Sequence, residues 1–187
     1  MTSTPPNTVL AVSGSLRHGS TNTLMLQAVA DLLPMGVTMI FFDGLGDLPH
    51  FSPERDADHE SGTAALPAVA RWRAAIAQAD AVLISTPEYA FGIPGVLKNA
   101  LDWVVSTVLF DQKPVGVISA SPGYEGGQQA MASLLPTLTA LNVHIPDGCS
   151  LVISSVKKKM NSDGQLVDEV TSALLTRLAE QLLGGAS

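Results

Sequence analysis

Residues 9–22 read VLAVSGSLRHGSTN, a short apolar run that passes through a polar loop into a helical pattern. The loop contains one permanent cation among glycines and hydroxyls, and Gly14 lets its backbone approach a ligand closely. Main-chain N–H groups and the helix dipole make such a turn attractive to anions. The stretch therefore predicts a phosphate-binding site. Its candidate ligand-binding residues are Ser15, Arg17, Ser20, Thr21 and Asn22.

A plainer interpretation of this first loop (residues 14–20) stays open. Ser20 is a good helix N-cap, and Arg17 can be an ordinary exposed charge. The loop has neither the Gly-Lys-Ser/Thr ending of a P-loop nor the Gly-x-Gly-x-x-Gly pattern of dinucleotide-binding folds. An adenine dinucleotide as the tightly held cofactor is therefore disfavoured.

Strands and helices are predicted to alternate along the whole chain. Apolar runs predict strands at residues 8–13, 37–42, 81–85, 114–120 and 150–154, and their continuous apolar character is typical of parallel strands buried on both faces. Helical patterns lie at residues 20–33, 66–79, 94–108, 127–141 and 166–183. In the last helix, the predicted apolar face comprises Val167, Val170, Leu174, Leu178 and Leu182. Together these elements predict one doubly wound α/β domain over residues 1–187, with residues 1–7 flexible.

A second ligand-shaped loop (residues 87–94) follows the third predicted strand, where residues 86–95 read TPEYAFGIPG. Pro87 fixes the exit from the strand, and Gly92 is expected to allow a backbone turn that presents N–H groups to a ligand. Pro94 suits the first turn of the next helix. Glu88 is either a polar anchor for the loop or a partner subunit, or an ordinary loop carboxylate.

The acidic segment (residues 43–65) is too long for a simple connection in a compact domain. A lid and an oligomer contact are both open for it. Five of its side chains, His50, Asp56, Asp58, His59 and Glu60, are potential metal ligands. Their spacing favours a mobile acidic loop instead, because it does not hold the ligands together.

The composition limits the classes of function. A formal charge of −7 without a broad basic cluster disfavours nucleic acid as a partner. With 46% hydrophobic and only 14% charged residues, the polar coat is thin, which favours a homo-oligomer. The single cysteine, Cys149, excludes an intrachain disulfide, so a bound cofactor would have to carry electrons in any redox chemistry. The chain shows neither a signal peptide nor a membrane-spanning run, which predicts a cytoplasmic protein without membrane partners.

Two motifs together resemble the NADPH-dependent FMN reductase family, over roughly residues 8–155. They are GSLR with Ser20 and Asn22 in the first loop, and PEY followed by PGVLKNALDW at residues 94–103. The resemblance implies a flavodoxin-like, three-layer αβα fold with five parallel strands. It also implies FMN held by its phosphate at the first loop, with the flavin ring along Pro87, Glu88, Tyr89, Ala90, Phe91 and Gly92. A third loop (residues 121–127), with Ser121 and Gly123, is implied to close on the ring.

The resemblance implies an enzyme as well as a fold. Family members transfer a hydride from NADPH to FMN and then reduce a small acceptor, such as a flavin, a quinone or an azo compound, and they are generally homodimers or homotetramers. No metal is implied, and no side chain is required as a catalytic acid or base. One departure is Ala90, where many members have Asn, so an amide that can bond the ring is missing.

Two other functions compete with the reductase. A flavodoxin-type electron carrier would bind FMN on the same fold without turning over NADPH. An α/β hydrolase is disfavoured because the chain has no Gly-x-Ser-x-Gly elbow.

Overall fold

The strands of the computed structural model, which describes residues 7–62, 66–124 and 126–184, form one parallel sheet. Their order is β2-β1-β3-β4-β5. They are β1 (Thr8–Ser13), β2 (Thr38–Phe42), β3 (Ala81–Thr86), β4 (Val115–Ala120) and β5 (Ser150–Ile153). This confirms the predicted doubly wound, flavodoxin-like α/β fold. Residues 1–6 of the expected flexible N-terminus lie outside the described residues, and Asn7 donates its main-chain N–H to Asp80 at 3.0 Å.

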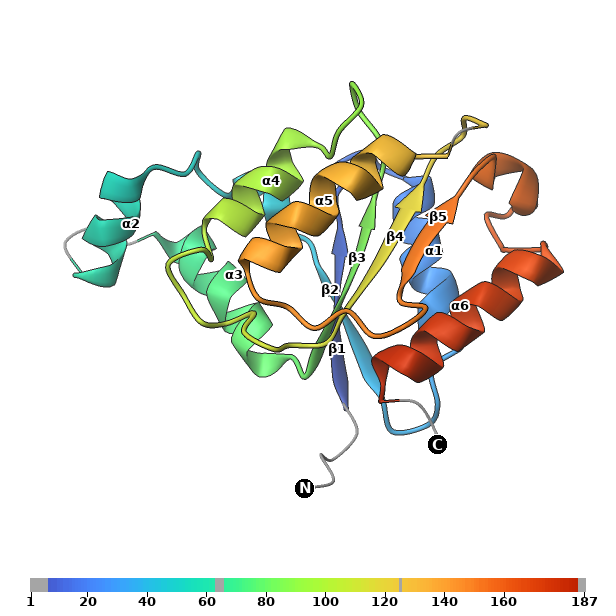
Figure 1. Cartoon of the computed structure of the whole chain (residues 1–187), viewed down its shortest axis with the longest axis horizontal. Helices are drawn as coiled ribbons and strands as arrows, with labels where there is room; N and C mark the ends of the chain where they lie inside the picture. The colour runs from blue at the N-terminus through green and yellow to red at the C-terminus, as the bar shows by residue number, and fades with distance from the viewer. Residues whose placement is uncertain (1–6, 63–65, 125, 185–187) are drawn as a thin grey trace.

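The helices form the two outer layers of the fold (Figure 1). They are α1 (Thr21–Ala30), α2 (Pro53–Glu60), α3 (Pro67–Gln78), α4 (Gly95–Asp102), α5 (Gln128–Ala140) and α6 (Glu169–Leu182), with short 3-10 turns η1 (Leu45–Asp47) and η2 (Val156–Lys159). Successive strand residues point to opposite faces. Leu10 and Val12 of β1 therefore join the cluster of α3, α4 and α5, whereas Val9 and Ala11 join that of α1 and α6.

Burial differs between the central and the edge strands. Every residue of β3 and β4 is buried, as the sequence predicts for parallel strands. The edge strands β2 and β5 are partly exposed, because each has only one neighbour and incomplete helix cover. Among the described residues, no helix is long and apolar enough to cross a membrane.

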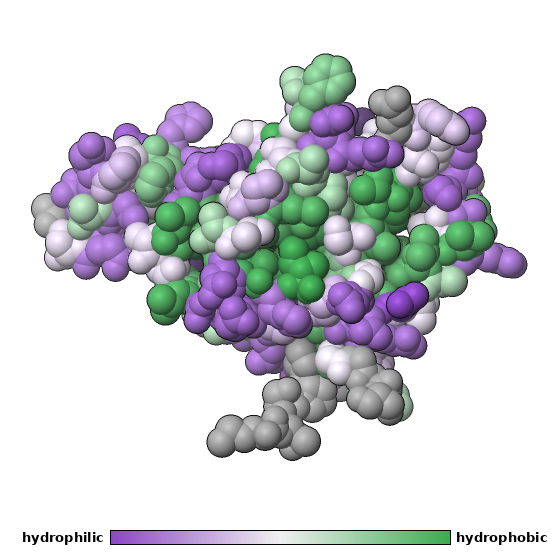
Figure 2. All heavy atoms as spheres, viewed as in Figure 1, coloured by the Kyte–Doolittle hydropathy of each residue, from purple (hydrophilic) through white to green (hydrophobic). Residues whose placement is uncertain are grey.

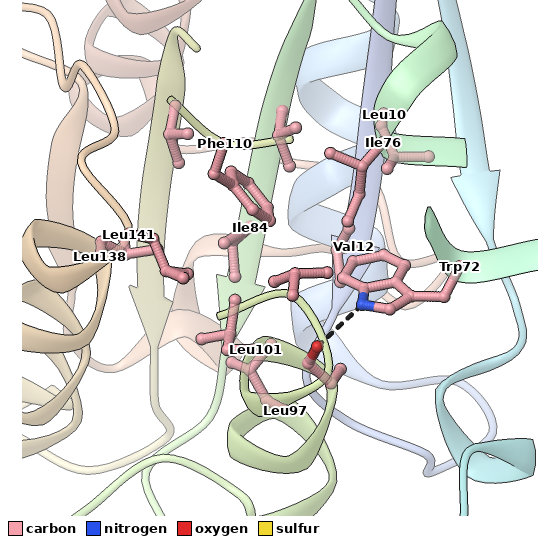
Figure 3. Close-up of a cluster of buried hydrophobic side chains, with 14 of the residues drawn as sticks. Leu10, Val12, Trp72, Ile76, Ile84, Leu97, Leu101, Phe110, Leu138 and Leu141 are labelled. Atoms are coloured by element: carbon pink, nitrogen blue, oxygen red, sulfur yellow. Dashed lines mark hydrogen bonds between the residues drawn. The ribbon is translucent and has the colours of Figure 1, made fainter. Parts of the chain in front are cut away.

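The larger core cluster fixes α3 against α4 (Figure 3). Trp72 of α3 is fully buried, and its indole N–H donates to the main-chain carbonyl of Ala100 in α4 at 2.8 Å. Leu97 and Leu101, on the inner face of α4, lie in the same cluster as Ile84 of β3. The position of α4 on the sheet is thus determined by both packing and a hydrogen bond.

Two expected helical features differ from the structure. The helix predicted over residues 94–108 ends at Asp102, where the chain continues in tighter turns with Val105 donating to the carbonyl of Asp102. Just beyond this end, the carbonyl of Trp103 accepts hydrogen bonds from Arg73 Nε at 3.0 Å and Nη2 at 2.7 Å. The apolar face predicted for the last helix is wrong at Val167, Val170 and Leu174, which are exposed, and Val167 precedes the start of α6. The inner face of α6 comprises Thr171, Leu175, Leu178, Ala179 and Leu182.

Candidate active site

The first and second loops meet where the strand order reverses, between β1 and β3. In doubly wound sheets, ligands bind at this point, outside the carboxyl ends of the strands. A cavity of about 260 Å³ opens between the two loops. It is lined by Gly14, Leu16 and Arg17 on one side and by Tyr89, Pro94, Gly95 and Val96 on the other. The structure thus brings together the two motifs that were singled out in the sequence.

Short-range hydrogen bonds shape the first loop. Ser20 is the N-cap of α1, and its hydroxyl accepts from the N–H of Asn22 at 3.2 Å. Ser15 accepts from the N–H of Arg17 at 3.3 Å. Gly14 is needed for close approach, because a Cβ there would lie 3.0 Å from Thr86 Oγ1. The first loop therefore lines the cavity with Gly14, Leu16 and Arg17 and then enters α1 at Thr21.

Arg17 has the free charge that an anion site requires. Its side chain is exposed and makes neither a hydrogen bond nor an ion pair within the described ranges. The first turn of a helix also leaves main-chain N–H groups without intrahelical partners. Guanidinium and helix N-terminus together form a donor set that suits a phosphate.

Asn22 lies beneath the first loop and is 1% exposed. Its amide Nδ2 donates to the carbonyl of Ala120 at 3.2 Å, and its Oδ1 accepts from Ser85 Oγ at 2.9 Å. Asn22 therefore joins α1 to the ends of β3 and β4. This role in holding the loop on the sheet was not foreseen from the sequence.

The second loop is a two-residue hairpin. Tyr89 and Gly92 exchange main-chain hydrogen bonds of 2.9 and 3.1 Å. The left-handed residues between them are Ala90, with φ 49°, and Phe91, with φ 63°. The expected turn is present, but its left-handed residues are Ala90 and Phe91 rather than Gly92, whose own N–H donates to the carbonyl of Tyr89. Positive φ at both central positions is the type I′ pattern.

The positive φ of Ala90 gives a conformational reason for the Asn that the family resemblance leads one to expect at this position. Asn tolerates the left-handed region better than Ala does, because its short polar side chain bonds locally. Ala90 in place of Asn therefore lowers the stability of the turn, independently of any contact between an Asn side chain and a ligand.

Large apolar side chains of the first three loops are exposed, and two of them, Leu16 and Tyr89, line the cavity. Leu16 is 59% exposed, Tyr89 53% and Phe91 81%. Tyr124 of the third loop is also exposed. Large exposed apolar groups of this kind are typical of ligand or protein contacts.

The third loop is tied to the segment after β5. Ser121 Oγ accepts from the N–H of Gly123 at 3.2 Å, and the carbonyl of Gly123 accepts from the N–H of Ser155 at 3.0 Å. At the far end of the loop, Gly127 is the N-cap of α5. Glu88 of the second loop accepts two hydrogen bonds from the start of that helix.

The acidic segment is clasped to α4. The Asn99 amide accepts from the N–H of Phe51 at 2.8 Å and donates to the carbonyl of Pro49 at 3.0 Å. Trp103 Nε1 donates to the same carbonyl at 2.7 Å. The acidic segment was considered as a lid or as an oligomer contact. A lid that opens at residues 49–51 would have to break these hydrogen bonds.

Helix α2 was missed in the sequence, although its start is signalled there. Ser52 caps it, with its hydroxyl accepting from the N–H of Arg55 at 3.3 Å, and Pro53 occupies the first turn. Asp56 and Glu60 of this helix both form ion pairs with Arg73. Within the described ranges, no group of three or more acidic, histidine or cysteine side chains is arranged to hold a metal.

A larger cavity and the cysteine lie away from this site. A larger hollow of about 1440 Å³ opens at the amino ends of the strands, near Lys113 and His144. That edge of a parallel sheet is not the one where ligands bind. Cys149 is buried, and burial raises the pKa of its thiol to about 11, so it is not a nucleophile at neutral pH.

Comparison with known proteins is consistent with this geometry. An NAD(P)H-dependent FMN reductase from Pseudomonas aeruginosa is 35% identical over 93% of this chain and 92% of its own. A 2-hydroxy-1,4-benzoquinone reductase from Burkholderia is 34% identical over 89% of each. Among solved structures, an NAD(P)H:acceptor flavoenzyme from Paracoccus denitrificans superposes with a TM-score of 0.76 at 29% identity, covering 95% of both chains.

The family profile described as NADPH-dependent FMN reductase matches residues 7–158. The match includes the first, second and third loops. The chain therefore belongs to the NADPH-dependent FMN reductase family.

Proposed function

We propose that this protein is an FMN-dependent NAD(P)H oxidoreductase that reduces a small acceptor. The observation that carries the proposal is Arg17: its guanidinium has no partner among the described residues, and it lines one cavity together with Tyr89 of the second loop at the switch point of the sheet. The family match and the named reductases among its relatives support the same activity.

The residues present fit the two ends of FMN. At the phosphate end, the fit rests on Arg17, which lines the cavity and whose guanidinium has no partner among the described residues. Ser15, Ser20, Thr21 and Asn22 are proposed to complete the phosphate site, although the Asn22 N–H and amide are bonded within the protein. The fit at the ring end is the hairpin of the second loop. Its ring-binding residues are proposed to be Pro87, Glu88, Tyr89, Ala90, Phe91 and Gly92, with Ser121 and Gly123 of the third loop closing from the side of β4.

When bound, FMN supplies the redox chemistry by taking up a hydride from NADPH and releasing electrons to the acceptor. The chain's own residues bind and orient it. Arg17 neutralises the phosphate, and the exposed Tyr89 and Phe91 offer aromatic surface beside an open cavity mouth. A side chain acting as acid or base is not required, which agrees with the remote position of Cys149.

A quinone is the first acceptor to test, because one matched relative is named for the reduction of a benzoquinone. The flavodoxin-type carrier is the less favoured function, because the relatives are named as reductases. Residues 1–187 are proposed to act as one FMN-binding domain in the cytoplasm. NADPH as electron donor and a single, buried cysteine support that compartment.

A homodimer or homotetramer is proposed for the assembly. Figure 2 shows hydrophobic residues over the part of one face that β5 and α6 form. Val152 of β5 is 42% exposed, and Val170 of α6 is 69% exposed. Burying such side chains in a subunit contact would compensate for the thin polar coat.

The test is the absorbance spectrum of FMN-loaded, desalted protein during anaerobic titration with NADPH. The flavin band is expected to survive desalting, to bleach with NADPH, and to return on addition of 1,4-benzoquinone. A band that survives but does not bleach would favour the electron carrier. Loss of all flavin, together with no FMN-dependent oxidation of NADPH, would contradict the proposed function.

A further inference from the structure

The start of α5 is capped from a distant part of the chain. Its own N-cap is Gly127, which has no side chain and a φ of 87°. Glu88 supplies the missing acceptor: Oε2 lies 2.9 Å from the N–H of Gln129 and 3.1 Å from that of Ala130. These are the second and third N–H groups of the helix, the ones that a capping side chain normally satisfies.

The charge of Glu88 also suits this place. A carboxylate at a helix N-terminus is stabilised by the positive end of the helix dipole. The residue is partly buried, and the two hydrogen bonds are charge-assisted, so the side chain is held in one position.

The cap connects the two loops proposed to contact the flavin ring. Glu88 immediately precedes the hairpin of Tyr89 to Gly92. Gly127, beside the capped N–H groups, ends the third loop, and its carbonyl accepts from Ser119 Oγ of β4 at 2.8 Å. A single side chain therefore joins the second loop to the start of α5, where the third loop ends.

From this geometry we infer that Glu88 is a positioning residue: by capping α5 it sets the second and third loops at the spacing that the flavin ring requires. Its carboxylate acts through main-chain N–H groups of the protein and not as a ligand of FMN. This inference rests on the proposed function, because it takes the second loop as the ring-binding loop.

Three substitutions distinguish the effect of the length of the Glu88 side chain from the effect of its charge. Glu88→Gln keeps an acceptor oxygen at the same distance from the backbone but removes the charge. Glu88→Asp keeps the charge but is one carbon shorter, and Glu88→Ala removes both. Positioning by reach predicts that Gln retains function and that Asp and Ala lose it. Action through charge predicts the reverse for Gln and Asp.

The first readout is hydrogen exchange of the Gln129 and Ala130 amides in protein without flavin. We expect exchange to accelerate at least about tenfold in Glu88→Ala and Glu88→Asp, and to stay within about threefold of wild type in Glu88→Gln. Glu169→Gln, which changes a carboxylate in the first turn of α6, is the matched control and leaves both amides unchanged.

The second readout is the dissociation constant for FMN and for riboflavin, followed by fluorescence. Because the cap serves the ring and not the phosphate, Glu88→Ala should weaken both ligands by the same factor, about tenfold. Glu88→Gln should restore most of the affinity for each.

Equal affinity of Glu88→Ala and wild type for both flavins would overturn the inference, and so would a variant set in which Asp retains binding and Gln loses it. If Glu88→Ala does not fold, the contrast between Gln and Asp decides the question. If wild type binds no flavin, the proposed function fails, whereas the amide-exchange contrast still tests the cap itself.

Discussion

Arg17 and Arg73 show how differently the molecule uses the same side chain. Arg17 in the first loop is exposed, without a partner among the described residues. Arg73 in α3 is buried, and its guanidinium bonds Asp56, Glu60, the Trp103 carbonyl and Ser106. The first loop leaves the Arg17 guanidinium available to a ligand, whereas Asp56 and Glu60 of the acidic segment bond Arg73 within the protein. A polar group without a partner in the protein, rather than a polar residue as such, therefore indicates the ligand-binding edge of the sheet.

The largest effect is expected where the closed cluster is broken. Arg73→Met leaves the carboxylate of Asp56, which is 5% exposed, without its cation. We expect a loss of about 3 kcal/mol or more in the free energy of unfolding, measured in urea. Arg71→Met is the control: Arg71 pairs with Asp43 and Asp47 at the surface, so its loss should cost no more than about 1 kcal/mol. Equal losses in the two variants would show that the buried cluster is not what holds this segment.

The amide clasp of the same segment should have the next largest effect. Asn99→Ala leaves the N–H of Phe51 and the carbonyl of Pro49 without that partner, although Trp103 still bonds the carbonyl. Unsatisfied, partly buried groups predict destabilisation of about 2 kcal/mol by urea unfolding. Lys98→Ala, which removes only an exposed pair with Asp102, should cost about 0.5 kcal/mol. A cost for Asn99→Ala no larger than that would mean that the acidic segment is held by its packing alone.

The turn of the second loop offers a gain in stability. Ala90 has a φ of 49°, a region that Asn adopts more readily. Ala90→Asn is expected to raise the free energy of unfolding by about 1 kcal/mol, and Ala90→Val to lower it, because β-branched residues are poorest there. Thermal and urea unfolding of both variants would measure this. Destabilisation by Asn would contradict the type I′ turn.

The smallest effect is expected for the partly exposed ion pair of Lys159 and Asp168. Asp168 accepts from Lys159 Nζ at 2.8 Å, and this bond together with those from Thr171 lowers the pKa of Asp168 to about 2. A carboxyl with a lowered folded-state pKa stabilises the protein above its unfolded pKa, near 3.8, and this contribution disappears as the pH falls towards 2. The difference in stability between wild type and Asp168→Asn should therefore be largest near neutral pH and shrink between about pH 4 and pH 2. A difference that does not vary with pH would contradict this.

The sheet was predictable because its signals are local. Each strand is a short apolar run, and each of the first two loops shows its polar motif in consecutive residues. The Ser52-Pro53 cap of α2 was equally local and was overlooked within an acidic stretch. Other features arise from contacts across the fold. Arg73 of α3 bonds the carbonyl of Trp103 just beyond α4, and Glu88 caps α5 from 41 residues away.

Whether a polar side chain finds a hydrogen-bond partner within the protein is likewise decided by the fold. Asn22 and Arg17 are both polar residues of one motif, yet Asn22 is buried against Ser85 and Ala120 while Arg17 stays free. Their spacing in the sequence does not distinguish them, because burial depends on the ends of β3 and β4.

The most direct test of the open first loop is a titration of wild type and Arg17→Ala with FMN and with riboflavin, which lacks the phosphate. Wild type is predicted to bind FMN at least about tenfold more tightly than riboflavin, as expected for a charge-assisted phosphate contact. Arg17→Ala should lose that preference while its riboflavin affinity and its free energy of unfolding stay unchanged. If Arg17→Ala binds FMN as tightly as wild type, Arg17 is not the phosphate anchor and the account of the open first loop is contradicted.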